Sequence, residues 1–157
     1  MSDARTLLRH TLATLAYRGG KAIRNAPPSY ANYRGHQTAR SPVEILAHIG
    51  DLLDWALSIA SGKQEWHNST PLAWDKECER FYRALKKFDD YLASDSPLHV
   101  PEEKLFQGPI ADIFTHVGQI SMLRRMGGSP VKGENYFVAD ISTGRVGPDQ
   151  AAPKREF

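Results

Sequence analysis

The sequence is notable first for what it lacks. Cys78 is the only cysteine among 157 residues, which excludes an internal disulfide framework and a cysteine-based zinc site. No run of about 18 apolar residues is present, so we expect no membrane-spanning segment. The N-terminal stretch has an acidic residue at Asp3 and no apolar core, so it predicts no secretory signal, and we expect a cytoplasmic protein.

A strong charge of either sign is also absent. The chain has 20 basic and 18 acidic residues, a formal net charge of +2. Because this balance leaves no general excess of positive charge, it does not indicate a nucleic-acid partner. The length predicts one domain. Together these features fit a bacterial cytoplasmic enzyme or binding module.

What the sequence does contain is helical periodicity in four segments. The clearest start is at Ser41-Pro42-Val43-Glu44, where a serine cap, a proline at the first helical position and a glutamate at the third form a capping box. From Trp74 to Leu92, apolar residues recur at alternating spacings of four and three, typical of helices packed nearly parallel. The predicted helices span about residues 3–24, 42–62, 71–94 and 109–126, separated by loops that include residues 25–41 and 97–108.

The sequence therefore predicts an all-α fold, a four-helix bundle with a non-helical C-terminal strap. We assign residues 1–140 to the bundle and residues 141–157 to a tail. Tyr136, Phe137, Val138 and Ile141 are too apolar for a free segment, so we expect them to pack on the bundle, whereas the last dozen residues look disordered.

Three residues are candidate metal ligands. His48 falls at the edge of the apolar face of the second helix, where both ring nitrogens need partners. Alone, it is better explained by a structural hydrogen bond than by a ligand role. Asp112 and His116 stand four residues apart, so they share one flank of the fourth helix, and Leu123 on the same stripe indicates that this flank faces protein. A carboxylate and an imidazole at this spacing can give a metal two ligands; alternatively, Asp112 is a first-turn acidic residue favoured by the helix dipole.

Three stretches carry a family resemblance: SPVEILAHIGDLLDWALSIASG, WDKECERFYRALKKFDDYLAS and GPIADIFTHVGQISMLRRMGGSPVKGENYF. Together they cover most of residues 5–140, and the most specific piece is the run from His116 to Ile120 (HVGQI). The sequence resembles the DinB-like superfamily of metal-binding four-helix bundles, which includes YfiT-type hydrolases and thiol-dependent transferases. The resemblance implies that His48 is the first metal ligand and His116 the last. The family's middle ligand is usually a histidine, but this chain has Asp112 there.

The expected ligand set is thus two histidines and one carboxylate, which suits Zn²⁺, Ni²⁺, Fe²⁺ or Mn²⁺. The resulting hypothesis is a metal-dependent hydrolase or a low-molecular-weight-thiol transferase, using metal-bound water or thiolate on a small-molecule substrate. The alternative is a non-catalytic bundle with a structural or vestigial metal site, acting as a dimerising or small-ligand-binding module. The resemblance, together with surplus tyrosines and tryptophans, favours a homodimer.

Other polar residues have simpler explanations. We expect His10 to lie on the surface, although it is also a possible fourth ligand. Asp51, one turn after His48, is a candidate hydrogen-bond partner for that imidazole. Cys78 falls within the aromatic seam and is expected to be a buried small residue. Arg124 and Arg125 complement the dipole at the end of the fourth helix, or hold an anionic substrate at one end of the bundle.

Overall fold

The long helices begin where side chains can satisfy their first N–H groups. In the computed structural model, which describes residues 2–157, Ser2 accepts a hydrogen bond from the Arg5 amide and caps α1 (Asp3–Ile23). The predicted capping box opens α2 (Pro42–Ala60). The other two long helices are α3 (Trp74–Ala93) and α5 (Ala111–Met126). All four predicted helices are therefore confirmed, although α3 starts three residues later than expected.

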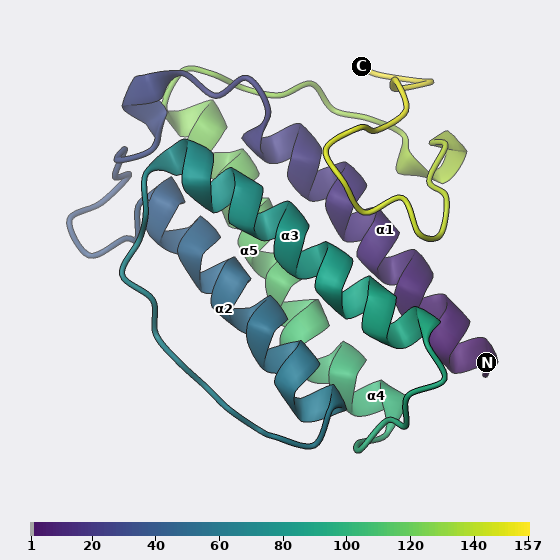
Figure 1. Ribbon diagram of the computed structural model, residues 1–157. Helices are drawn as coiled ribbons and strands as arrows, with labels where there is room; N and C mark the ends of the chain where they lie inside the picture. Colours follow the sequence, from purple (N-terminus) through teal and green to yellow (C-terminus); the bar gives the residue numbers. More distant parts are fainter. Residues whose placement is uncertain (1) are drawn as a thin grey trace.

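These helices form the predicted four-helix bundle (Figure 1). Helix α1 packs against α3 and α5, and α2 packs against the same two helices. The core between them holds large, fully buried side chains, each stabilising the fold by about 1.5–3 kcal/mol; they include Leu12, Leu15, Leu53, Phe81, Phe88 and Ile113. Short 3-10 turns cover Pro28–Tyr30 (η1) and Tyr136–Val138 (η3), and no β-strand occurs within residues 2–157. None of the helices in this part of the chain combines the length and the apolar character needed to cross a membrane.

The segment before α5 differs from the prediction. Residues 97–108 were expected to form a loop, but helix α4 (Glu102–Leu105) runs into a π-helical turn, η2 (Phe106–Ile110), and then directly into α5. Pro109 is the physical reason for the wide turn, because proline has no N–H and its ring conflicts with the carbonyl group four residues earlier. Asp112 lies in the first turn of α5, as the alternative explanation expects, but α4 and η2 precede this turn without a break, so it has fewer free N–H groups for a carboxylate to stabilise.

The C-terminal segment is more ordered than the sequence suggests, and in Figure 1 it runs back along the bundle beside α1. Val146 is 1% exposed and belongs to the core. Glu134 and Glu156 form an isolated backbone bridge, and Lys21 of α1 contacts their carboxylates at 2.7 and 2.9 Å. The expected disorder of the last dozen residues is therefore wrong. So is the expected packing of Phe137, which is 96% exposed.

Candidate metal centre

The structure brings the three predicted ligands together at the contact between α2 and α5. His116 Nε2 lies 3.4 Å from Asp112 Oδ1, and His48 Nε2 lies 4.0 Å from Asp112 Oδ2. The two imidazole rings meet edge to face, with centroids 4.8 Å apart and planes at 87°. One potential ligand atom from each residue lies within 4.8 Å of the others, so the group could hold a metal ion.

The backbone explains this placement. Asp112 and His116 are one helical turn apart on α5, and the neighbouring Ile113 and Val117 are buried and press that part of the helix onto the core. The ligand flank is left at the rim of the α2–α5 contact. The His116 side chain is 12% exposed and that of His48 is 20% exposed, whereas that of Asp112 is 47% exposed. The cluster is therefore closed on the histidine side and open to solvent on the carboxylate side.

The donor set fits a divalent transition metal. Bonds of about 2.0–2.1 Å in tetrahedral geometry place neighbouring ligand atoms about 3.3 Å apart. The separation of 3.4 Å between Asp112 Oδ1 and His116 Nε2 matches this value. His48 Nε2 lies 4.0 Å from the other carboxylate oxygen, Oδ2, so the exposed carboxylate must move to share one ion with both histidines. Two imidazoles and one carboxylate leave at least one coordination position for another molecule.

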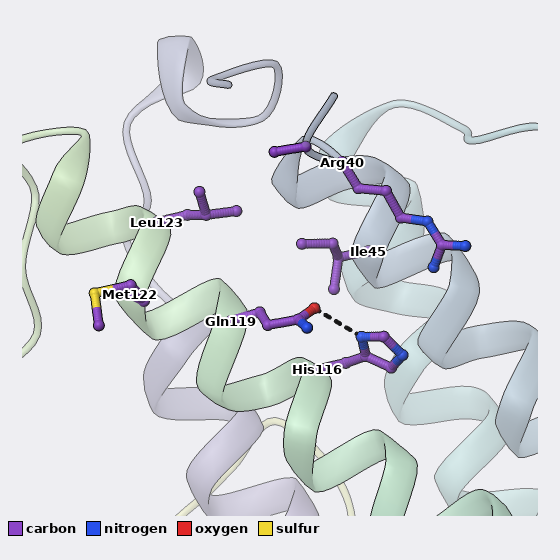
Figure 2. Close-up of a pocket in the computed structure, with 7 residues that line it drawn as sticks. Arg40, Ile45, His116, Gln119, Met122 and Leu123 are labelled. Carbon is purple, nitrogen blue, oxygen red and sulfur yellow. Dashed lines mark hydrogen bonds between the residues drawn. The ribbon is translucent and has the colours of Figure 1, made fainter. Parts of the chain in front are cut away.

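His116 is oriented by a neighbour on its own helix. Its Nδ1 lies 2.8 Å from Gln119 Oε1, as Figure 2 shows. Because the amide oxygen only accepts, Nδ1 carries the proton and Nε2 presents its lone pair towards the cluster. Gln119 thus selects the imidazole tautomer that binds metal at Nε2.

The surroundings of His48 favour its neutral form. Burial lowers its pKa below 6.5, the nearby His116 and Arg40 lower it further, and Asp112 and Asp51 only partly oppose them. The ring of Trp66, from the loop after α2, packs edge-on to His48 with centroids 5.8 Å apart. A neutral imidazole is the form that binds metal, so the surroundings favour a ligand role for His48.

Two cavities adjoin the cluster. One of about 410 Å³ is reached from His116 (Figure 2) and is lined mostly by apolar atoms; the other, of about 220 Å³, is reached from His48 and is more polar. Arg40 lines both. No sequence pattern singles out Arg40, because it sits in an irregular loop whose path is set by tertiary contacts.

A second group of potential ligands comprises Asp51, Asp54 and His67. Here Arg80 already pairs with both carboxylates, because its guanidinium lies 2.6 Å from Asp51 and 2.9 Å from Asp54. A divalent cation at this point would meet the positive charge of Arg80. Asp51 also accepts hydrogen bonds from the amide and hydroxyl of Ser69. We therefore describe this group as an ion-pair network that ties the loop after α2 to α2 and α3.

The structure also bears on the predictions for Asp51, His10 and Cys78. Asp51 makes no hydrogen bond to His48, so its expected role as the partner of that imidazole is wrong. His10 is exposed and contacts Thr143, as expected of a surface residue. Burial raises the pKa of the Cys78 thiol to about 12, which agrees with a packing role and not with a nucleophile.

The two consecutive arginines have different roles. Arg124 is buried and donates hydrogen bonds to the Ala22, Arg24 and Ser129 carbonyl groups, joining the ends of α1 and α5. Arg125 is exposed. Only Arg125 is therefore free to meet a ligand.

Comparisons with known proteins add nothing to this geometry: no family model, curated protein or solved structure matches the chain. Any assignment of function rests on the arrangement of these side chains.

Proposed function

We propose that the chain is a DinB-like metal-binding protein that uses a divalent transition metal to act on a small molecule, by hydrolysis or by transfer of a low-molecular-weight thiol. The observation that carries the proposal is the convergence of His48, Asp112 and His116 from two helices, with their potential ligand atoms within 4.8 Å of one another. When bound, the metal supplies a Lewis acid that makes a water or thiol ligand nucleophilic at neutral pH.

The number and exposure of the ligands support a reactive centre over a structural one. Structural zinc sites are closed by four protein ligands. This group contains three His, Cys, Asp or Glu ligands among residues 2–157, and one of them, Asp112, is half exposed. The open side leaves room for a substrate group to reach the metal position.

The chain's own residues supply the rest of the site. The two adjoining cavities, of about 410 and 220 Å³, match the size of small-molecule pockets. Arg40 lines both, where its guanidinium can bind a carboxylate or phosphate group of a substrate. Ile45 and Leu123 give the larger cavity apolar walls beside His116.

Metal analysis tests the proposal directly. Untagged protein is dialysed against Zn²⁺, Mn²⁺, Ni²⁺ or Fe²⁺ and the bound metal is measured by mass spectrometry. We expect about one equivalent per chain for at least one of these ions, lost in His48→Ala and in His116→Ala. His36→Ala is the matched control, because His36 is exposed and lies outside the cluster. A wild-type protein without stoichiometric metal, or unchanged metal content in both cluster variants, would contradict the proposal.

A Co²⁺-substituted protein separates the two chemistries. A small thiol that enters the coordination sphere produces a thiolate-to-cobalt charge-transfer band, whereas water does not. Bound metal whose spectrum responds to neither thiol nor pH would identify the non-catalytic alternative, in which the bundle holds metal for stability alone.

A further inference from the structure

A third cavity, of about 500 Å³, lies between α1, α5 and the segment after α5. Its α5 residues include Phe114, Val117 and Ser121, which project about half a turn around the helix from His116 and Gln119. The cavity is therefore separate from the metal centre. Nothing in the proposed metal chemistry uses it.

This cavity is positively charged. Arg18, Arg125 and Lys132 line it, and no aspartate or glutamate does. Within residues 2–157 none of the three cations makes an ion pair or a side-chain hydrogen bond; Arg18 instead places its guanidinium 4.2 Å from the centroid of the Tyr136 ring. Glu134, the carboxylate nearest to Lys132 in the sequence, is buried and bound to Tyr17 and Lys21. Glu156 lies close enough for Lys132 to lower its pKa, but its ion pair is with Lys21. Three neighbouring cations without a paired carboxylate create a field that attracts an anion.

One residue of the cavity lining is an exposed glycine that the fold itself does not require. Gly118 lies in the interior of α5, where glycine weakens a helix relative to alanine. A Cβ atom added there would meet no atom within 4 Å, so packing leaves space for a side chain. Its φ is not in the left-handed region that favours glycine. A glycine without a backbone or packing role fits a place where a ligand approaches the helix closely.

We propose that this cavity binds a small phosphate monoester whose phosphate is held by Arg18, Arg125 and Lys132 and whose apolar group lies over Gly118. Three cations exceed what one carboxylate needs, and the planar forks of two arginines match phosphate oxygens. Phe114, Val117 and Tyr136 give the apolar group its wall. The volume of about 500 Å³ accommodates a molecule of that size.

Calorimetric titration of the full chain with phenyl phosphate, inorganic phosphate, benzoate and phenol tests this site. We expect phenyl phosphate to bind once per chain and more tightly than the other three probes. Gly118→Leu fills the cavity and abolishes binding, and Arg125→Gln weakens it by about 10-fold or more. Arg83→Gln, an exposed arginine on α3 away from the cavity, leaves it unchanged.

One further variant and one stability measurement keep the result interpretable. His116→Ala is expected to bind phenyl phosphate like the wild type; loss of binding in His116→Ala with binding retained in Gly118→Leu would place the phosphate at the metal centre and overturn the proposal. Leucine is a better helix former than glycine, so thermal unfolding of Gly118→Leu is expected at or above the wild-type temperature. Should Gly118→Leu not fold, the affinity of the Arg125→Gln variant for phenyl phosphate tests the proposal, because Arg125 is exposed. Absence of saturable binding, or tighter binding of benzoate, also overturns the proposal.

Discussion

Gln119 Oε1 accepts a hydrogen bond from Nδ1 of His116 across 2.8 Å, and this contact fixes which nitrogen of the imidazole faces Asp112 and His48. The residue that orients the ligand is therefore three positions away on the same helix, in the HVGQI stretch that carries the family resemblance. The contribution of Gln119 to metal affinity can be measured separately from that of the ligand His116.

Replacing Gln119 with leucine removes the acceptor and leaves the ligands in place. We expect Zn²⁺ affinity to fall by about 10–100-fold, because the wrong tautomer and a freely turning ring then compete with binding. Gln119→Glu keeps an acceptor oxygen and is the matched control, expected to bind at least as tightly as the wild type. Competition with a chromogenic chelator gives both constants. Equal losses of Zn²⁺ affinity in Gln119→Leu and Gln119→Glu would show that the hydrogen bond to His116 does not determine the affinity.

Asp112 is the second point to test, since it stands where the resemblance implies a histidine. Asp112→Ala removes one ligand and should weaken Zn²⁺ binding by more than Gln119→Leu does, because a ligand bond is lost. Asp112→His is expected to restore tight binding through a third imidazole, and to shift preference away from the more oxygen-seeking Mn²⁺. Metal competition experiments on the three proteins measure this preference. Wild-type affinity in Asp112→Ala would remove Asp112 from the ligand set.

The ion-pair network of Arg80 and Asp51 predicts a large stability effect. Both side chains are almost completely buried, with Nη2 2.6 Å from Oδ1. Arg80→Leu leaves the Asp51 carboxylate without its main partner and should lower the free energy of unfolding by about 3–5 kcal/mol. The exposed Arg83→Leu, on the same helix, should change it by less than about 0.5 kcal/mol.

A double variant identifies the cause of that loss. Adding Asp51→Leu to Arg80→Leu removes the stranded charge, so part of the lost stability should return. Urea unfolding of the wild type, Arg80→Leu, the double variant and the Arg83→Leu control provides the comparison. If the second substitution only adds to the loss, packing and not charge explains the effect of Arg80.

Asp51 also predicts an acid dependence of stability. Burial raises its pKa, but hydrogen bonds from Arg80 and Ser69 lower it by more, so the net shift is below the ordinary 3.8. The stabilisation from the ionised carboxylate is complete above pH 3.8 and is lost as the pH falls through the lowered pKa. Asp51→Asn should therefore be less stable than the wild type at neutral pH and lose less stability on acidification. Urea unfolding between about pH 2 and pH 6 measures this, with the exposed Asp95→Asn as control.

The C-terminal segment predicts an effect far from the bundle in sequence. Val146 is fully buried, so Val146→Ala should lower the free energy of unfolding by about 2 kcal/mol. Val138 is 38% exposed, and Val138→Ala should have an effect below about 0.5 kcal/mol. Equal small effects would mean that the tail is not part of the cooperative unit. Thermal and urea unfolding of both variants distinguish these outcomes.

The success of sequence reasoning differs between the helices and the segments that join them. Local rules locate α2, because the serine cap, proline and glutamate at residues 41–44 act over one turn. They also place Asp112 and His116 on one flank, since four residues is about one helical turn. His48 was expected at a helix edge, but its meeting with α5 depends on how two helices pack.

Local sequence rules do not predict where residues of irregular segments lie in the fold. Arg40, Trp66 and His67 reach the two clusters only through the paths of their loops, and no periodicity encodes such paths. The burial of Val146 has the same origin, because it reflects contacts with distant parts of the chain. The order of the tail follows from Lys21 and the core, not from its own composition.

The π turn before α5 also sets the register between α4 and α5. A π turn holds one residue more than an α-helical turn, so the side chains that follow it are rotated by about 100° relative to an uninterrupted helix. Leu105 before the turn and Ile113 after it are both buried, and deleting a single residue from Phe106–Ile110 would prevent both from facing the core. A deletion that removes no ligand would thus set the burial of Leu105 against the orientation of Asp112 and His116 towards His48.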